Sequence, residues 1–588
     1  MKNVSNRILL QKNISRTKAS KKDMKLSDLS VTGERKYRKI LLVKSPATLW
    51  SGGGGAISAN IAEVINIPLG IGYLASALSE GGYEVEMFDP QLDLYFVDDG
   101  NTVEKLKRVI RERLEHRNYD LVGISSMYVY AHQWAHYIAE VVKEVNREVP
   151  VIIGGGHPTL MIEETMDDQN IDYLVEGEGE VTLLSLLHAL NGGQQVAMDE
   201  IGGLAYREGG HLITRDRDNY IWDLDSLPFP DWDIVGLEKY IKMFNDTSLE
   251  DYGVSVPMVT ERGCPYQCTF CNVSDSWGYS FRKRSPQNVL DEVDILINRY
   301  DIRDIVFVDD NMTIDKQRML DICDGLKQRN VTWQVVNMAS FNSNEKIVRA
   351  MKESGCKKVS ISIESASPRI LKKMKKPVNL DKSLVIINEC KKIGLPITAN
   401  FVTGMHYETK EDIMKTFEWA EIAKADWSTF SILAPYPGTE IFDQCVEDGY
   451  LNTDTVDLGW FSHRNAAIET EHWNKEWVTD QTYHHNLMIN FVKNHNLVGD
   501  GKNLDFAIGF FEYVVLHHKK HLLGAIALAY AMKKRGNKEK AEALLEHALE
   551  MVDDEEIQQV FGRYLAMDEE LINFFHQWCD AHAEVVEL

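Results

Sequence analysis

Cysteine is scarce in this sequence, which has only eight cysteines in 588 residues. Five of them are scattered without a pairing pattern: Cys323, Cys356, Cys390, Cys445 and Cys579. Such usage is typical of a reducing compartment, where thiols are core residues or ligands and not crosslinks. Long apolar runs are absent as well, and the N-terminal stretch has no apolar segment of the length that a secretory signal needs. We therefore expect a cytoplasmic protein without a transmembrane segment.

Positive charge is also in short supply. The chain has 64 Lys and Arg against 89 Asp and Glu, a net charge of −25. This balance repels polyanions, so we expect no nucleic-acid substrate. The exception is residues 1–38, which contain 11 Lys or Arg and only three acidic residues. That stretch predicts a disordered, solvated basic tail.

Strands and helices alternate in the pattern of the first half of the chain. With 44% hydrophobic and 26% charged residues, the chain has the composition of a globular protein and the length of several domains. Between residues 39 and 195, short apolar runs alternate with amphipathic stretches, which predicts a Rossmann-like, doubly wound parallel sheet with helices on both faces. Residues 196–250 break the pattern with a hairpin about Gly209-Gly210 and a proline-stiffened connector, and we interpret them as a linking strap.

The alternation resumes over residues 251–440 with a longer period. Six candidate strands occur there: 255–260, 304–309, 332–336, 358–363, 397–402 and 428–433. Six strand-helix units are too few to close an eight-stranded barrel, so we predict a partial barrel of the TIM type. Residues 441–588 contain only helical patterns, including a tetratricopeptide-like helix pair about Gly536, and predict a helical C-terminal domain.

The remaining cysteines, Cys264, Cys268 and Cys271, lie together in "TERGCPYQCTFCN". Close thiolates indicate zinc, an iron-sulfur cluster or a redox dithiol. Structural zinc needs four ligands, and no further Cys or His lies nearby in the sequence. A dithiol would leave the third cysteine unexplained. Three thiolates on a 4Fe-4S cluster leave one iron free for an exogenous ligand, which favours a catalytic cluster at the carboxyl-terminal mouth of the barrel.

The CxxxCxFC motif at the head of a partial barrel resembles the radical S-adenosylmethionine (SAM) enzymes. The resemblance implies that SAM chelates the fourth iron and that one electron from the cluster cleaves it to a 5'-deoxyadenosyl radical. Polar residues at consecutive strand ends match the places where the family binds SAM, and "LAPYPGTEIF" resembles the segment that closes the sixth strand. The implied cofactor-binding residues on the barrel are Asp309, Asp310, Asn337, Ser362, Glu364 and Asn400.

The resemblance extends upstream, to cobalamin-binding domains fused to radical SAM barrels. The segments "PLGIGYLASAL", "GISSMY", "IIGGGHPT" and "LVEGEGEVTLLSLL" occur in the order seen in such proteins. A Gly-rich loop after an apolar strand lets the backbone approach a flat ligand. The implied cobalamin-binding residues are Gly70, Ser125, Ser126, Gly154, Gly155, Gly156, His157, Glu176 and Gly177.

One departure from many cobalamin-binding domains concerns the lower ligand of cobalt. Those domains use an Asp-x-His-x-x-Gly motif, and the corresponding place reads Asp89-Pro-Gln-Leu-Asp-Leu94, without histidine. The corrin is then either held without a protein histidine or no longer bound. We expect retained binding because the glycine loop and the acidic stretch are intact.

These features lead to one functional hypothesis and several alternatives. We expect a cobalamin-dependent radical SAM enzyme that methylates an unactivated carbon of a small or lipid-like molecule, with a flavodoxin or ferredoxin as electron donor. Oxidative cyclisation or ring rearrangement, as in anaerobic tetrapyrrole cyclases, and a non-catalytic cobalamin or redox sensor remain open. The tail histidines His517, His518 and His521 lack a carboxylate at metalloprotease spacing and are interpreted as surface or core residues.

Overall fold

The computed structural model describes residues 35–47, 66–94, 102–193, 196–218, 220–247, 255–452 and 466–582. Residues 1–34 of the predicted basic tail lie outside the described residues. The chain divides into two compact units. Unit 1 comprises Met1–Asp310 and Ala434–Ser462, and unit 2 comprises Asn311–Leu433 and His463–Leu588.

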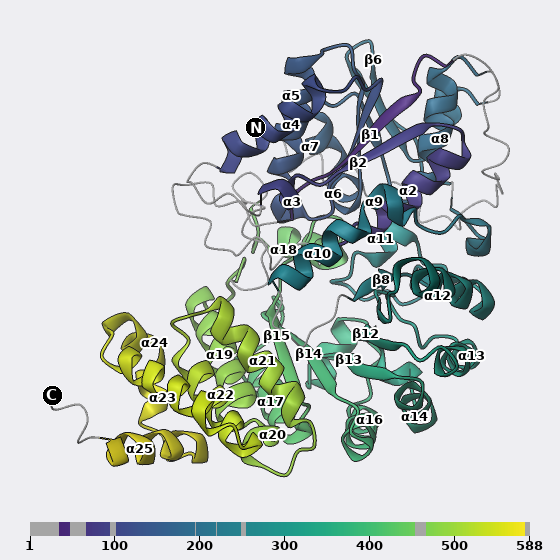
Figure 1. The fold of residues 1–588 in the computed structure, drawn as a ribbon. Coiled ribbons are helices and arrows are strands. Elements are labelled where there is room, and N and C mark those ends of the chain that lie inside the picture. Colours follow the sequence, from purple (N-terminus) through teal and green to yellow (C-terminus); the bar gives the residue numbers. More distant parts are fainter. Residues whose placement is uncertain are drawn as a thin grey trace. The chain divides into compact units, whose positions relative to one another are not determined.

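A seven-stranded sheet forms the centre of the first part of unit 1 (Figure 1). Its strands are β1 (Lys39–Lys44), β2 (Glu84–Phe88), β3 (Leu121–Ser125), β4 (Val151–Gly154), β5 (Tyr173–Val175), β6 (Leu204–Glu208) and β7 (His211–Thr214). The order is β2-β1-β3-β4-β5-β6-β7, with parallel pairing from β2 to β5. The strand order reverses between β1 and β3, and the crevice at such a switch point is where doubly wound sheets bind ligands.

Both faces of this sheet are covered by helices, as predicted. Alternate residues of β1 point to opposite cores, because side chains alternate across a strand. Ile40 and Leu42 pack with α2 (Leu69–Glu80) and α8 (Gly179–Leu190), whereas Leu41 and Val43 pack with α4 (Thr102–Glu115) and α5 (Gln133–Val145). Figure 1 shows the two helix layers on either side of the strands.

The predicted hairpin extends this sheet, although we interpreted its surroundings as a linking strap. β6 pairs antiparallel with β5, and β7 pairs antiparallel with β6. Gly209 and Gly210 both have positive φ, at 56° and 83°, as a type I′ turn requires. The connector that follows contains α9 (Trp232–Val235) and α10 (Leu237–Thr247), and it buries Trp232.

All six predicted strands of the partial barrel are observed. They are β8 (Val256–Met258), β11 (Asp304–Phe307), β12 (Thr332–Met338), β13 (Cys356–Glu364), β14 (Ile397–Thr403) and β15 (Trp427–Ile432). The order β15-β14-β13-β12-β11-β8 follows the chain. The helices that follow successive strands include α12 (Pro286–Tyr300), α13 (Lys316–Lys327), α14 (Glu345–Glu353), α16 (Leu380–Ile393) and α17 (Lys410–Ala423). The side chain of Ser285 caps α12 by accepting a hydrogen bond from the Asn288 N–H, and Pro286 opens the helix.

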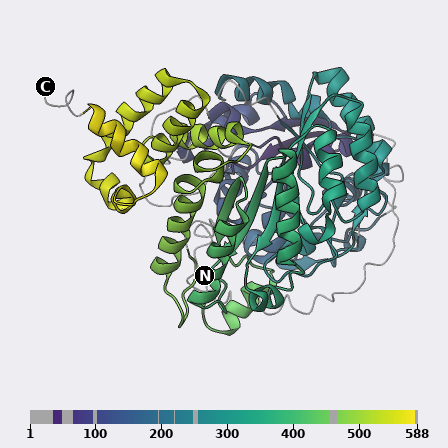
Figure 2. The ribbon, with the colours of Figure 1, turned by 90° about the horizontal axis from the view of Figure 1, so that it is seen from below.

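Helices dominate the described residues from 475 onward (Figure 2). Their apolar side chains share one core. The helices include α19 (Lys475–Leu487), α21 (Leu504–His517), α22 (Leu522–Arg535), α23 (Lys538–Val552), α24 (Glu555–Leu565) and α25 (Glu570–His582). Gly536 ends α22 with φ 90°, so α22 and α23 form the predicted helix pair. The core reaches unit 2's sheet where Trp427 stacks on Phe510, with 4.3 Å between ring centroids. In the part of the chain that the structure describes, no helix has the length and apolarity to cross a bilayer.

Candidate functional site

The three clustered cysteines lie on one loop of unit 1, between β9 (Glu261–Arg262) and α11 (Val273–Trp277). Cys264, Cys268 and Cys271 are all partly exposed, and none forms a disulfide. The Cys271 N–H donates to the Cys268 carbonyl at 3.1 Å, which turns the chain between the last two thiols. Three accessible thiols on one short loop suit the thiolate ligands of an iron-sulfur cluster.

Gly263 places the start of this loop where no side chain fits. Its φ is 86°, and an added Cβ would lie 2.4 Å from the Ser280 carbonyl oxygen. The crowding arises because β9 pairs antiparallel with β10 (Arg282–Lys283), which draws residues 278–280 over the loop. A glycine is therefore required immediately before Cys264.

We expect Gly263→Ala to lower the iron content per chain and to destabilise unit 1. Gly210→Ala is a matched control, because Gly210 has φ 83° but nothing within 4 Å of an added Cβ. The control should cost about 1–2 kcal/mol, the cost of positive φ for alanine, whereas Gly263→Ala adds roughly 1–3 kcal/mol for overpacking. Thermal unfolding and iron analysis after anaerobic reconstitution measure both effects. Equal stability and iron content in the two variants would contradict this account.

Asp309 and Asp310, predicted to bind cofactor, support the strand that leads into the cysteine loop. The buried Asp309 carboxylate accepts hydrogen bonds from the Thr260 N–H at 2.5 Å, the Thr260 hydroxyl at 2.7 Å and the Glu261 N–H at 3.2 Å. Burial, reinforced by the charge of Asp309, raises the pKa of Asp310 to about 7. Asp310 also interacts with the Gly263 backbone N–H. Both carboxylates thus hold the base of the loop, and direct cofactor contact stays a prediction.

Three of the predicted SAM-binding residues lie together in unit 2. The Ser362 hydroxyl on β13 donates to the Asn337 side-chain oxygen on β12 at 2.6 Å. Ser362 is also the register partner of Asn400 on β14. The three side chains therefore form a polar row across adjacent strands, as expected when the ends of parallel strands carry a ligand site.

Glu364, the fourth predicted residue of unit 2, ends β13 in an unusual conformation. Its φ is 68°, which is uncommon for a residue with a side chain, and the β13–β14 register shifts between Ser362 and Glu364. Its carboxylate pairs with the Lys376 ammonium at 2.8 Å, and both side chains are largely buried. Such strained positions cluster at functional sites.

Glu408, which sequence reasoning missed, closes the loop after β14. Its buried carboxylate accepts hydrogen bonds from the N–H groups of Gly404 and Met405 at 2.7 and 2.9 Å. Its carbonyl oxygen accepts a hydrogen bond from the Trp473 indole at 3.0 Å. Burial is the largest influence on this carboxyl and raises its pKa to about 8.

We expect Glu408 to make unit 2 less stable as pH rises. Between the ordinary pKa of 4.5 and the folded value of about 8, the folded protein keeps a proton that the unfolded chain has lost. The free energy of unfolding should fall across this window by up to about 5 kcal/mol. Glu408→Gln should remove that slope in denaturant titrations at several pH values, and Glu418→Gln, an exposed site on α17, should keep it. A slope that survives in Glu408→Gln would contradict the assignment.

Most of the predicted cobalamin-binding residues meet at the carboxyl ends of β3 and β4. The Ser126 N–H donates to the Gly154 carbonyl at 2.8 Å, and the Ser126 carbonyl accepts from the His157 N–H at 3.2 Å. The Ser125 carbonyl accepts from the Ser45 N–H at 2.9 Å, which ties the end of β3 to the end of β1. These residues thus border the switch point of the sheet.

The glycine loop after β4 packs closely against the loop after β3. An added Cβ on Gly155 would lie 2.5 Å from the Ser126 carbonyl oxygen, and on Gly156 it would lie 2.6 Å from that of Met127. Backbone contact with the β3 loop therefore already requires these glycines. Gly70, by contrast, is exposed on α2 with nothing within 4 Å of an added Cβ.

Glu176 and Gly177 follow β5 and make contacts within the protein. The Gly177 N–H donates to the Thr159 hydroxyl at 2.9 Å, and an added Cβ would clash with the Arg217 side chain. Arg217 lies 3.9 Å from the Glu176 carboxylate, whose pKa burial raises. Their role in holding a cofactor stays a prediction.

The segment without the lower-ligand histidine is ordered by its own ion pair. Residues 90–94 form α3 (Pro90–Leu94), and the buried Asp89 pairs with Lys44 at 2.8 Å. The Tyr240 hydroxyl also donates to Asp89 at 2.6 Å. Asp89 thus joins β1, β2 and α10 from within the chain.

Sequence reasoning also missed a buried ion-pair network, because it assigned the acidic stretch to the cofactor. The Arg262 guanidinium lies 3.1 Å from Glu178 and 2.6 Å from Glu180, and Arg282 lies 2.5 Å from Glu178. All four side chains are almost fully buried. The network ties the start of α8 on the first sheet to β9 and β10 beside the cysteine loop.

The segment "LAPYPGTEIF" also contacts both parts of unit 1. The Ile441 N–H donates to the Thr269 carbonyl, within the cysteine loop, at 2.9 Å. Tyr436 packs against Val129, Leu160 and Met161 of the first sheet's helices and loops. The segment, which follows β15 in the chain, therefore contacts both the cysteine loop and the elements around the seven-stranded sheet.

Family models match both the barrel with the cysteine loop and the domain of the seven-stranded sheet. The radical SAM superfamily model matches residues 258–420, and the B12-binding domain model matches residues 58–187. The class that the fold and site define is therefore a radical SAM enzyme with a cobalamin-binding domain. An uncharacterised methyltransferase of Pyrococcus horikoshii is 32% identical over 454 residues, covering 76% of this chain and 90% of the relative. The chain belongs to the cobalamin-binding radical SAM enzymes, whose cofactors are a 4Fe-4S cluster, SAM and cobalamin.

Further relatives and solved structures agree with this membership. Cytidylyl-2-hydroxyethylphosphonate methyltransferase of Streptomyces wedmorensis is 29% identical, covering 71% of this chain and 84% of the relative. OxsB, a cobalamin-dependent SAM radical enzyme, superposes with TM-score 0.61 at 15% identity over 98% of this chain and 89% of its own. The methyltransferase TsrM from Kitasatospora setae superposes with TM-score 0.60 at 17% identity over 87% and 99%. At these identities the structures show the fold alone, which is the predicted one.

Proposed function

We propose that the protein is a methyltransferase that adds a methyl group to an unactivated carbon of a small or lipid-like molecule. One observation carries the proposal: the cysteine loop and the cobalamin-binding sheet belong to one compact unit and are joined by the buried ion pairs of Arg262 with Glu178 and Glu180. The Pyrococcus and Streptomyces relatives, each matched over more than four fifths of its length, are both methyltransferases, which supports this choice.

The chain's own residues would hold the reactants. When bound, the cofactors supply a radical that abstracts substrate hydrogen and a methyl group for transfer. We assign the cluster ligands to Cys264, Cys268 and Cys271, and SAM contacts to the row Asn337, Ser362 and Asn400. The loops after β3 and β4 would hold the corrin. A carbon radical must be kept from other reactants, so we expect the protein to shield the site when substrate is bound.

The products of SAM distinguish methylation from the alternatives. By the family's chemistry, each methylation consumes one SAM as methyl donor and a second as radical source. We expect reduced, cobalamin-loaded protein to form S-adenosylhomocysteine and 5'-deoxyadenosine in equal amounts when given its substrate. Substrate is sought by incubating the protein with methyl-deuterated SAM and small-molecule extracts, and by searching for products that carry the intact labelled methyl group. Substrate-dependent 5'-deoxyadenosine without labelled product would overturn the proposal.

Oxidative cyclisation is the second candidate, favoured by a different relative. The anaerobic magnesium-protoporphyrin IX monomethyl ester cyclase of Rubrivivax gelatinosus is 28% identical, covering 64% of this chain and 66% of the relative. A cyclase would form 5'-deoxyadenosine with substrate but would not consume a methyl group, and a sensor would form neither product. Either chemistry needs a low-potential electron donor, for which we propose a flavodoxin or ferredoxin in the cytoplasm.

A further inference from the structure

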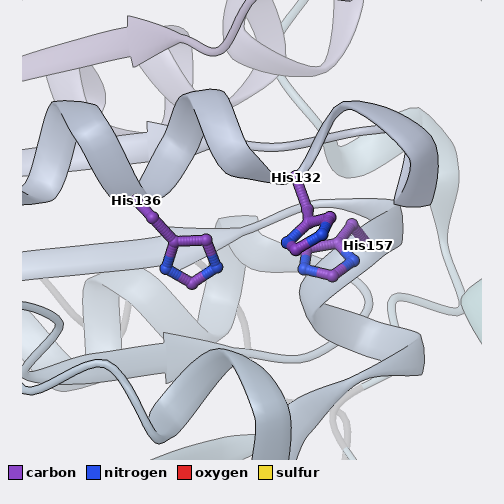
Figure 3. A group of neighbouring side chains, drawn as sticks. All are labelled: His132, His136 and His157. Atoms are coloured by element: carbon purple, nitrogen blue, oxygen red, sulfur yellow. The ribbon is translucent and has the colours of Figure 1, made fainter. Parts of the chain in front are cut away.

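Three histidines of unit 1 converge beside the first sheet, outside the cysteine loop (Figure 3). His132 immediately precedes α5, His136 lies in its first turn, and His157 lies on α6 (Gly156–Leu160). One ring nitrogen from each lies within 4.8 Å of the others. The ring centroids of His132 and His157 are 5.0 Å apart, and those of His132 and His136 are 5.5 Å apart. Within the described residues, this is the group of His, Cys or carboxylate side chains whose geometry suits a metal ion.

His157 is the buried member of the group and has an unused nitrogen. Its side chain is 1% exposed, and its Nε2 lies 3.3 Å from the Thr165 hydroxyl on α7 (Ile162–Met166). Its Nδ1 is buried without a hydrogen-bond partner among the described residues. A buried polar atom without a partner costs free energy, so it indicates a ligand that completes the site.

His136 is held by a carboxylate, as metal-bound histidines commonly are. Its Nδ1 lies 2.8 Å from the Asp168 carboxylate. Asp168 in turn accepts hydrogen bonds from the backbone and side-chain N–H groups of Asn170, both at 2.9 Å. A carboxylate on one ring nitrogen fixes the ring's orientation and tautomer and leaves the other nitrogen available to a metal ion. Asp168 is thus placed as a positioning residue.

We propose that His132, His136 and His157 bind a divalent transition-metal ion, with zinc as the ion that suits them best. Three imidazole nitrogens, with the Asp168 carboxylate turned to His136 and outside the group of ligand atoms, favour zinc, copper, nickel or cobalt over magnesium or calcium. Metal–nitrogen distances of about 2.0–2.1 Å require the three nitrogens to approach one another more closely than they do here. The partly exposed ring of His132 can approach His157 by side-chain rotation, whereas His136 keeps the orientation that its contact with Asp168 gives it.

Three protein ligands leave one coordination position for water or another molecule. The ion would join the start of α5 to α6, directly after the glycine loop that follows β4. This assigns His157 a ligand different from the corrin contact that the family resemblance implies. The site uses none of the cluster cysteines, but it shares His157 and the loops after β3 and β4 with the corrin site of the proposed function.

The test is calorimetric titration of zinc into the cluster-loaded, full-length protein. We expect one zinc per chain, with nitrogen or oxygen and no sulfur neighbours in zinc-edge X-ray absorption. His132→Ala and His136→Ala, both at partly exposed sites, should weaken binding at least about ten-fold, and Asp168→Asn about 10–100-fold. His211→Ala, at an exposed residue of β7, is the matched control and should bind zinc as the unaltered protein does.

Several outcomes would overturn this inference. They are an absence of zinc binding, binding that survives both His132→Ala and His136→Ala, and a sulfur neighbour that places the ion at the cysteines. Loss of cobalamin retention in the two histidine variants, without zinc binding by the unaltered protein, would assign the histidines to the corrin pocket instead. Circular dichroism of each variant confirms that the fold persists.

Discussion

Cys268→Ala is expected to abolish reductive cleavage of SAM. Cys268 lies between the other two thiols of the loop, and its carbonyl oxygen accepts the hydrogen bond that turns the chain toward Cys271. A 4Fe-4S cluster with only two protein thiolates is not retained, because these clusters are held by Cys thiolates. Without the cluster, no electron reaches the sulfonium. The measurement is 5'-deoxyadenosine formed by dithionite-reduced protein, together with iron and sulfide per chain.

Cys579→Ala is the matched control for this experiment. Cys579 is also a partly exposed, free thiol, but it lies on α25 in unit 2. Cys579→Ala should have the same iron content, and form the same amount of 5'-deoxyadenosine, as the unaltered protein. Full cluster retention and SAM cleavage in Cys268→Ala would remove this cysteine from the cluster.

Arg262→Met is expected to lower the stability of unit 1 by about 3–5 kcal/mol, the cost of removing one partner from a buried ion pair. The substitution leaves Glu180 buried without its cation and leaves Glu178 with Arg282 alone. Stability is measured by denaturant unfolding followed by tryptophan fluorescence, and cluster content by iron analysis. We also expect less iron, because Arg262 directly precedes Gly263 and Cys264.

An exposed ion pair in the same unit provides the control. Arg38 and Glu84 lie 2.6 Å apart, and both side chains are more than half exposed. Glu84→Gln should therefore change stability by about 0–1 kcal/mol, as exposed pairs do. If Arg262→Met were no more destabilising than Glu84→Gln, the network would not tie the first sheet to the cysteine loop.

The fold could be predicted because its signals are local. Apolar runs of strand length, the Ser285-Pro286 helix start and the Gly209-Gly210 turn each depend on neighbouring residues. The polar row could also be expected from the sequence, since the carboxyl ends of parallel strands meet at one edge of a sheet. The family resemblance implied Asn337, Ser362 and Asn400, and strand order explains why the three lie on adjacent strands.

The missed features depend on residues that are distant in the sequence. Arg262 pairs with Glu178 and Glu180, 84 and 82 residues away, so the acidic stretch was assigned to the cofactor. Asp309 likewise accepts hydrogen bonds from the N–H groups of residues 260 and 261, which lie 49 and 48 residues earlier in the sequence. Neither partner can be identified from periodicity or composition.

The histidine group illustrates the same limit. The spacing of His132 and His136 places them one helical turn apart, which is readable from the sequence. His157 joins them only because β3 and β4 are adjacent in the sheet, so that the loops following both strands meet.

Electron paramagnetic resonance of the reduced, anaerobically reconstituted protein tests the central claim most directly. The claim is that one iron of the cluster has no protein ligand and is available to SAM. We predict the signal of a reduced 4Fe-4S cluster whose g-values change when SAM is added, and whose ⁵⁷Fe Mössbauer spectrum contains one distinct iron site. A signal that SAM leaves unchanged, a cluster with four equivalent protein-bound irons, or zinc in place of iron would contradict the account.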